Sequence, residues 1–271
     1  MYNKAVEAKN YIKQQFSGNP KTAIVLGSGL TSIMNELTSK VEILYKDIPN
    51  FVESTVKGHV SKLVFGKIDG KEVLLMSGRF HYYEGYTMRE ITFPIYVFKL
   101  LGIKNLILTN SCGGINIDKV KPGSLMVVND FINLMPTNPL IGDNDERFGT
   151  RFPDMTEPYS LELRRLAKEK AKILNIPYIE GIYTGFMGPY YETKAEIERI
   201  KRMGSDAVGM STIPETIVSN YLGLNTLAFA TITNMATGIQ KIKHSHDNVV
   251  KMANDASVTL ALWIKMIVKE L

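Results

Sequence analysis

Cysteine, tryptophan and long apolar runs are all scarce in this sequence. Its 271 residues include a single cysteine, Cys112, and a single tryptophan. A lone cysteine excludes an intramolecular disulfide and a multi-cysteine zinc site, and it fits a reducing compartment. No window approaches the roughly 20 apolar residues of a membrane-spanning helix. The first residues carry Lys4, Glu7, Lys9 and Lys13, where an export signal needs an unbroken apolar stretch, so we expect a cytoplasmic protein.

Charge is only slightly unbalanced. Lysine and arginine total 32 against 27 acidic residues, which gives a formal net charge of +5. These charges are scattered, without the basic stripe interleaved with aromatic residues that is typical of nucleic-acid-binding proteins. We therefore expect no nucleic-acid partner and no membrane partner. A small anionic ligand would account for the excess equally well.

The pattern of apolar residues predicts an α/β fold. Short β-rich runs alternate with helical patterns along nearly the whole chain, which favours a mostly parallel sheet covered by helices. The length and the 45% apolar content are sufficient for one domain over residues 1–271. Two alternating strands between Lys62 and Ser77 flank Asp69-Gly70, which suits a hairpin turn, so we expect a mixed sheet. The other strands are predicted over Thr22–Leu26, Leu106–Thr109, Leu125–Val128, Ile179–Thr184, Ala207–Met210 and Leu227–Ile232.

Capping signals predict several helices. A threonine followed three residues later by a glutamate is typical of a helix start, and a glycine is typical of a helix end. A long stretch from Pro136 to Pro158 is rich in Pro, Asp, Asn and Gly; loops of this length are usually functional or mobile. The helices expected on these signals run from Thr87 to Gly102, from Thr193 to Gly204, from Pro214 to Gly223 and from Asp247 to Glu270.

Glycine-containing segments follow two of the predicted strands. The first strand leads into Gly27-Ser28-Gly29, whose backbone N–H groups and serine hydroxyl can surround a phosphate. A dinucleotide fingerprint needs a third glycine where Ser32 stands, so that interpretation is disfavoured. Another strand ends in Asn110-Ser111-Cys112-Gly113-Gly114, at the edge where open α/β sheets bind ligands. Residue 110 is not the glycine of a nucleophile elbow, which favours backbone N–H donors or close packing over a Cys112 nucleophile.

The segment Gly78–Gly85, GRFHYYEG, is a candidate anion site. Arg79 and His81 occupy alternate positions, so they project from one face of an extended segment, and both can donate hydrogen bonds to an oxyanion. Tyr83 continues that face. The alternative is a histidine whose ring is satisfied by neighbouring carbonyls.

A second polar segment, Gly188–Thr193, indicates a site for a flat ligand. Glu192 stands beside two tyrosines at the end of a predicted strand, and a nucleobase offers the complementary features, a face that stacks and N–H groups that donate to a carboxylate. The alternative is a helix-entry glutamate favoured by the helix dipole. Two further strand ends, Val208–Ser211 and Ile232–Asn234, carry polar residues that indicate little on their own.

Two clusters resemble metal sites but lack ligands. His244-Ser245-His246 has no third ligand at metal spacing. Asp143-Asn144-Asp145-Glu146 lacks the glycine that a calcium loop needs at position six, where Phe148 stands. We interpret both as solvated loops and expect no metal.

Taken together, these segments resemble the trimeric purine nucleoside phosphorylases, the family that cleaves inosine and guanosine. The resemblance covers nearly the entire chain and depends on the joint occurrence, in order, of several segments. They are VLGSGL, TVKGHVSKLVFG, GRFHYYEGY, LTNSCGG, PGSLMVVNDFINL, NDERFGTRFPDM, GPYYETKAEI, GSDAVGMSTIPE and TITNMATGI.

The resemblance implies a mixed, partly barrel-like sheet flanked by helices, a homotrimer, and reversible cleavage of purine ribo- or deoxyribonucleosides by phosphate. It implies phosphate as a co-substrate and no cofactor. Asn234, Glu192 and His81 would be the catalytic residues. By the same resemblance, phosphate would be held by Ser28, His59, Arg79, His81, Ser211 and the backbone N–H of Ser111; the base by Tyr191, Glu192 and Asn234; and the pentose by Tyr83, Met210 and His246, with Phe152 entering a neighbouring subunit's pocket.

Within that resemblance Asn234 indicates the base. Its amide suits a 6-oxopurine, whereas related phosphorylases for 6-aminopurine nucleosides carry aspartate there. The nearest alternative is a methylthioadenosine phosphorylase. A nicotinamide-dependent dehydrogenase is more remote, because Asp47 is the only near candidate for its ribose-binding acid.

Overall fold

The computed structural model describes residues 1–54, 61–240 and 246–271 of one α/β domain. The described residues form a nine-stranded sheet in the order β2-β3-β4-β1-β5-β8-β7-β6-β9. An additional pairing of β5 with β9 closes five of these strands into a barrel, as expected from the resemblance. The strands are β1 Thr22–Val25, β2 Thr38–Leu44, β3 Lys62–Ile68, β4 Lys71–Ser77, β5 Asn105–Gly114, β6 Leu125–Asn133, β7 Tyr178–Gly185, β8 Ala207–Gly209 and β9 Asn225–Met235.

The sheet is mixed, as the hairpin signal predicts. Strand β1 pairs parallel with β4 and β5, whereas β3 pairs antiparallel with β4. Asp69 and Gly70 form the turn between β3 and β4 with φ angles of 46° and 83°, values that asparagine, aspartate and glycine tolerate best. The alternating exposure expected of these two strands is wrong: both are largely buried on both faces.

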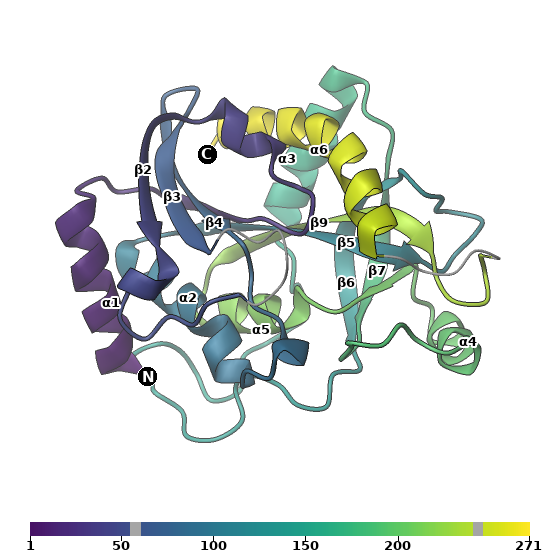
Figure 1. Cartoon of the computed structure of the whole chain (residues 1–271), viewed down its shortest axis with the longest axis horizontal. Coiled ribbons are helices and arrows are strands. Elements are labelled where there is room, and N and C mark those ends of the chain that lie inside the picture. The colour runs from purple at the N-terminus through teal and green to yellow at the C-terminus, as the bar shows by residue number, and fades with distance from the viewer. Residues whose placement is uncertain (55–60, 241–245) are drawn as a thin grey trace.

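Helices cover both faces of the sheet and explain that burial (Figure 1). One apolar cluster joins Ala23 and Val25 of β1 to helices α1, α2 and α5, and the other joins the intervening Ile24 to α3 and α6. None of the helices in the described ranges has the length and apolar character to cross a bilayer. The helices are α1 Tyr2–Gln15, α2 Met88–Leu101, α3 Leu161–Leu174, α4 Lys194–Arg202, α5 Ile213–Tyr221 and α6 His246–Val268.

The predicted capping boxes form at both expected helix starts. Thr87 and Thr193 each accept a hydrogen bond from the backbone N–H three residues on, and Glu90 and Glu196 accept from the threonine backbone N–H at 2.7 Å. Strand β2 and helix α3 were not predicted. Most of β2 is exposed at the edge of the sheet, so it lacks the apolar alternation from which a strand is inferred.

Strands β1, β4, β5 and β9 run parallel to one another, so their carboxyl ends meet at one edge. The turns after β1 and β4 carry Ser28, Arg79 and His81, and the last residues of β5 and β9 themselves include Ser111 and Asn234. This edge is where a ligand is expected in an open α/β sheet.

Candidate active site

One pocket lies at this edge and gathers most of the predicted site residues. It also takes in residues from the end of β8 and from the segment before α4, on the barrel side of the sheet. Ten side chains expected at the site line it: Ser28, Arg79, His81, Tyr83, Ser111, Tyr191, Glu192, Met210, Ser211 and Asn234.

The glycine turn after β1 needs both of its glycines. A Cβ on Gly27 would lie 2.8 Å from the Thr109 carbonyl oxygen of β5, and Gly29 has a φ of 73° with Ala253 of α6 equally close. These close approaches place Ser28 in the pocket wall. The Ser111 hydroxyl donates to the Ser28 carbonyl at 2.9 Å and ties the turn to β5.

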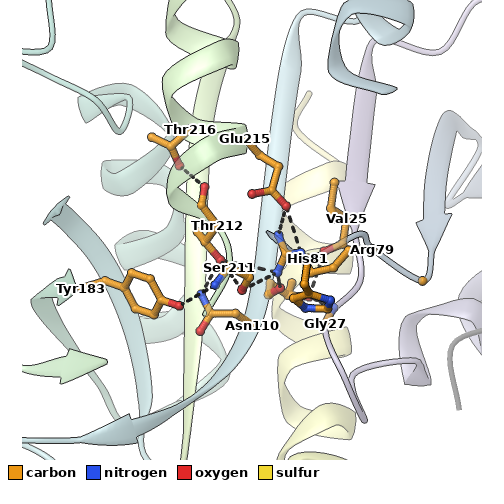
Figure 2. Close-up of polar contacts among 12 residues, drawn as sticks. Val25, Gly27, Arg79, His81, Asn110, Tyr183, Ser211, Thr212, Glu215 and Thr216 are labelled. Carbon is orange, nitrogen blue, oxygen red and sulfur yellow. Dashed lines mark hydrogen bonds and ion pairs between the residues drawn. The ribbon is translucent and has the colours of Figure 1, made fainter. Parts of the chain in front are cut away.

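Arg79 lies at the bottom of the pocket with about 1% of its surface exposed. Its Nη2 is 2.8 Å from Glu215 Oε1 on α5, and its Nη1 donates to the Thr109 carbonyl at 2.7 Å and to Ser211 Oγ at 3.2 Å (Figure 2). The sequence predicted the cation but not its counter-ion. Glu215 therefore balances the charge of Arg79 within the protein.

His81 is held by a carboxylate that sequence reasoning did not assign. Glu84 Oε1 accepts from the His81 backbone N–H at 2.7 Å and lies 3.1 Å from His81 Nδ1. Since a carboxylate only accepts, Nδ1 carries the proton. Burial lowers the pKa of His81, and the hydrogen bond to Glu84 opposes that effect. The expected extended strand ends here, because Tyr82–Glu84 form a 3-10 turn that stacks Tyr83 on His81 with ring centroids 4.7 Å apart.

Tyr191, Glu192 and Asn234 also line the pocket. Glu192 is 5% exposed, and burial raises its pKa. It therefore lies in the pocket, rather than on a solvent-exposed helix entry. Asn234 Nδ2 donates to the Met235 carbonyl at 3.1 Å, and Asn234 Oδ1 accepts from the Thr233 hydroxyl at 2.9 Å. These two contacts orient the Asn234 side-chain amide, with Nδ2 toward the Met235 carbonyl and Oδ1 toward the Thr233 hydroxyl.

Cys112 lines the pocket, but its surroundings do not suit a nucleophile. The thiol is buried, and its Sγ lies 3.6 Å from the Thr231 carbonyl. Burial raises the pKa of the thiol well above its usual range, which suppresses the reactive thiolate. Close packing, one of the two roles favoured from the sequence, accounts for this residue.

For two predicted residues the structure gives no placement at the pocket, and a third lies away from it. His59 lies outside the described residues, and His246 begins α6 but its side chain is not described. Phe152 is 84% exposed and does not line the pocket. Its loop is tied down by Arg89 Nη2, which donates to the Ile141 carbonyl at 2.9 Å, and by the Tyr221 hydroxyl, which donates to the Asp145 carbonyl at 2.9 Å.

Asp143-Asn144-Asp145-Glu146 lies in the same loop. Across the described part of the chain, no three His, Cys, Asp or Glu side chains are grouped as metal ligands. His244 and Ser245 of the other cluster fall outside the described residues.

Sequence reasoning missed several residues of the site besides Glu84 and Glu215. Asn110 and Thr233 belong to segments that were singled out, but neither received a role. Val249 comes from α6, which is distant in sequence from the other lining residues. Asn110 is 1% exposed, and its Oδ1 has no hydrogen-bond partner among the described residues. No signal in the sequence separates it from an ordinary strand residue.

Comparisons with known proteins agree with this architecture. Residues 21–269 match the family model of the phosphorylase superfamily, so the chain belongs to that superfamily. It is similar to purine nucleoside phosphorylase 1 of Bacillus subtilis, at 46% identity over 100% of this chain and 99% of that protein, and to its Geobacillus stearothermophilus counterpart, at 45% identity over 98% and 96%.

The structural match is equally extensive. A Schistosoma mansoni purine nucleoside phosphorylase, solved in complex with adenosine, superposes with a TM-score of 0.94 at 35% identity, over 99% of this chain and 97% of that one. The chain therefore belongs to the purine nucleoside phosphorylases, the family whose reaction is the phosphorolysis of purine nucleosides. The methylthioadenosine phosphorylase and dehydrogenase alternatives find no support in these relatives.

Proposed function

We propose that this enzyme cleaves the 6-oxopurine nucleosides inosine and guanosine in preference to adenosine. One observation carries the proposal: Glu192 and Asn234 line the same pocket as Ser28, His81 and Ser211. An ionised carboxylate accepts the N1–H of hypoxanthine or guanine, whereas adenine has no N–H at N1. The Asn234 amide supplies both a donor and an acceptor for the O6 and N7 edge.

The other end of the pocket supports a phosphate site beneath the pentose. Hydroxyls of Ser28 and Ser211, the Ser111 backbone N–H, Arg79 and His81 are the donors assigned to it. Phosphate oxygen forms the new bond to C1′ as the bond to the base breaks, and the bonding pair passes to the purine. His59 is assigned to the same phosphate. Tyr83, Met210 and His246 are assigned to the pentose.

Catalysis follows from stabilising two charges that develop together. The pentose becomes positive as the bond to the base lengthens, and the phosphate anion lies close to that charge. The purine becomes negative, and Asn234 donates to its O6 and N7 edge as electrons arrive. Polar groups placed in advance where charge develops are usually the largest contribution to such a rate enhancement.

We further propose that the enzyme is a homotrimer. Phe152 is a large apolar side chain at 84% exposure, on a loop held by Arg89 and Tyr221. An exposed aromatic ring on a tethered loop is suited to bind a surface of a second copy. In this assembly Phe152 closes the pentose side of a neighbour's pocket.

The proposal also covers the cofactor requirement and the cellular location of the enzyme. The charges of the reaction are met by protein donors and by phosphate itself, so we assign no cofactor. The single cysteine is consistent with a cytoplasmic location.

The direct test is to incubate the protein with inosine, guanosine or adenosine, each with and without phosphate, and to measure release of the base. We expect phosphate-dependent release from inosine and guanosine, with a much lower kcat/KM for adenosine. Equal release without phosphate would contradict phosphorolysis. A higher kcat/KM for adenosine would contradict only the base preference.

A further inference from the structure

Thr212 has a backbone conformation that its side chain disfavours. The residue is fully buried, with φ of 73° and ψ of −47°, and the Ile213 backbone N–H donates to the Ser211 carbonyl at 2.8 Å across it. This three-residue turn is rare, and a β-branched residue at positive φ is a marked outlier. Strain of this kind persists where the surroundings enforce it, and it is most common at functional sites.

The side chain of the strained residue does not cap the helix that it precedes, although its carbonyl accepts the Thr216 backbone N–H at 2.9 Å. Thr212 occupies the N-cap position of α5, where a threonine hydroxyl usually accepts a backbone N–H of the first turn. Here the side chain makes no capping hydrogen bond. The hydroxyl lies instead beside Asn110, Arg79 and Ser211, three residues that line the pocket (Figure 2).

Three groups surround this hydroxyl. Asn110 Nδ2 donates to Thr212 Oγ1 at 2.9 Å, Arg79 Nη1 donates to it at 3.4 Å, and Ser211 Oγ lies 3.2 Å away. The first two groups can only donate through these nitrogens. The single proton of Thr212 is therefore directed to Ser211 Oγ.

The orientation of the Thr212 proton determines whether Ser211 presents its own proton or a lone pair to a ligand. Ser211 Oγ accepts from Thr212, and it shares with Thr212 Oγ1 the second Nη1 proton of Arg79, since the first goes to the Thr109 carbonyl at 2.7 Å. With both acceptor positions occupied, its own proton remains for another group. An anionic oxygen is a stronger acceptor than the neutral Tyr183 phenol, which lies near Ser211 and receives its backbone N–H at 3.4 Å.

We propose that Thr212 is a positioning residue of the anion site: its hydroxyl holds Ser211 as a hydrogen-bond donor toward phosphate. The inference rests on the proposed assignment of Ser211 and Arg79 to phosphate. Because the ionised oxygens of phosphate only accept hydrogen bonds, a serine hydroxyl that points its lone pairs at them would weaken binding. The strained turn places the Thr212 hydroxyl where it prevents that orientation.

The test compares Thr212→Val, which keeps the shape and branching but removes the hydroxyl, with Thr212→Ser, which keeps the hydroxyl. We expect Thr212→Val to raise the KM for phosphate about tenfold or more, the size of one lost hydrogen bond to a charged group. The KM for inosine should stay within about twofold. Thr212→Ser should restore most of the phosphate affinity. Unchanged phosphate KM in Thr212→Val, or equal increases for both substrates, would overturn the proposal.

A double-mutant cycle tests the route through Ser211. If Thr212 acts through that hydroxyl, adding Thr212→Val to Ser211→Ala should raise the phosphate KM no further. Independent, multiplying increases would contradict the relay. If Thr212→Val does not fold, Thr212→Ala carries the same expectation with less crowding. Wild-type protein that releases no base with phosphate would refute the proposed function, whereas an active wild type with an unaffected Thr212→Val would refute only this inference.

Discussion

The Arg79 guanidinium and the Glu215 carboxylate form a buried ion pair at the bottom of the pocket. Arg79 Nη2 and Nε lie 2.8 and 3.0 Å from Glu215 Oε1, and the two side chains are 1% and 7% exposed. Arg79 follows β4, whereas Glu215 lies in the first turn of α5. The pair therefore joins the proposed anion site to helix α5, and it makes Arg79 less available as a free positive charge.

Removing one partner of this pair should destabilise the fold. Glu215→Gln leaves Arg79 buried without its counter-charge, so we expect the free energy of unfolding to fall by about 3–5 kcal/mol. Urea denaturation measures the change. The matched control is Glu198→Gln, which breaks the exposed pair of Glu198 with Arg202 at 2.9 Å and should cost little. If both variants lost the same free energy of unfolding, burial would not explain the contribution of the Arg79–Glu215 pair.

The base end of the pocket should depend on Asn234. Asn234→Ala removes the donor to the purine, so we expect kcat for guanosine to fall by about 10²–10³, with an unchanged circular dichroism spectrum. Asn234→Asp places an acceptor where a 6-amino group donates, and it should raise the adenosine-to-inosine ratio of kcat/KM. If Asn234→Ala turned over guanosine at the wild-type rate, Asn234 would not belong to the base-binding site.

Protonation of Glu192 should make activity fall at acidic pH, with a midpoint above the usual pKa of a carboxyl group. Burial raises its pKa from the usual 4.5, and the ionised form accepts N–H groups of the base more strongly than the protonated form. We therefore expect kcat/KM for guanosine to rise with pH through the raised pKa of Glu192, and Glu192→Gln to lose this dependence together with most activity.

The same pKa has a consequence for stability. The folded state holds the Glu192 proton more tightly than the unfolded state, so this group makes the free energy of unfolding fall as pH rises from about 4.5 to the raised pKa. Glu192→Gln removes that contribution. Urea unfolding at several pH values compares the two proteins, and an identical slope in both would argue against a raised pKa.

Glu84 should control the ionisation of His81. Because the hydrogen bond from His81 to Glu84 raises the pKa of the imidazole against the effect of burial, Glu84→Gln should lower that pKa further. An NMR titration of the His81 ring measures this directly. We also expect a higher KM for phosphate, since the ring loses the acceptor that fixes its orientation. A His81 pKa that stays the same or rises would contradict the assignment.

Phe152 should matter for activity without mattering for the fold of one chain. At 84% exposure, Phe152→Ala should leave the unfolding of a single chain unchanged. Loss of a buried phenyl contact in the assembly, worth about 1.5–3 kcal/mol, should raise the KM for inosine about 10- to 100-fold. Mixed oligomers supply the control: combining Phe152→Ala chains with inactive Glu192→Ala chains should restore activity, because the latter donate an intact Phe152. No restoration would contradict the shared pocket.

Much of the fold could be predicted where local signals are strong. The hairpin at Asp69-Gly70 and the helices started by Thr87 and Thr193 were predicted and are confirmed. These features depend on turn and capping chemistry within a few residues. The edge strand β2 was missed because its exposed residues make few contacts that would impose an apolar pattern.

Only part of the candidate site could be predicted from the sequence. The resemblance named ten of the residues that line the pocket, but it did not assign roles to Glu84, Glu215 or Thr212. Glu215 and Thr212 matter through contacts of the start of α5 with Arg79 and Asn110, which are far apart from it in the sequence, whereas Glu84 contacts His81 within the turn that follows β4. Nothing near Glu215 in the chain indicates that its partner is Arg79.

The sequence by itself determined the α/β class, the turns and caps, and the set of polar residue types able to hold an anion and a base, because these properties depend on residue chemistry and short-range spacing. Only the tertiary structure decided how those groups are paired and which protons they offer. Packing of distant segments buries Arg79 against Glu215 and places the Thr212 hydroxyl beside Asn110, whereas the short turn after β4 holds His81 against Glu84; these contacts set charge and donor direction.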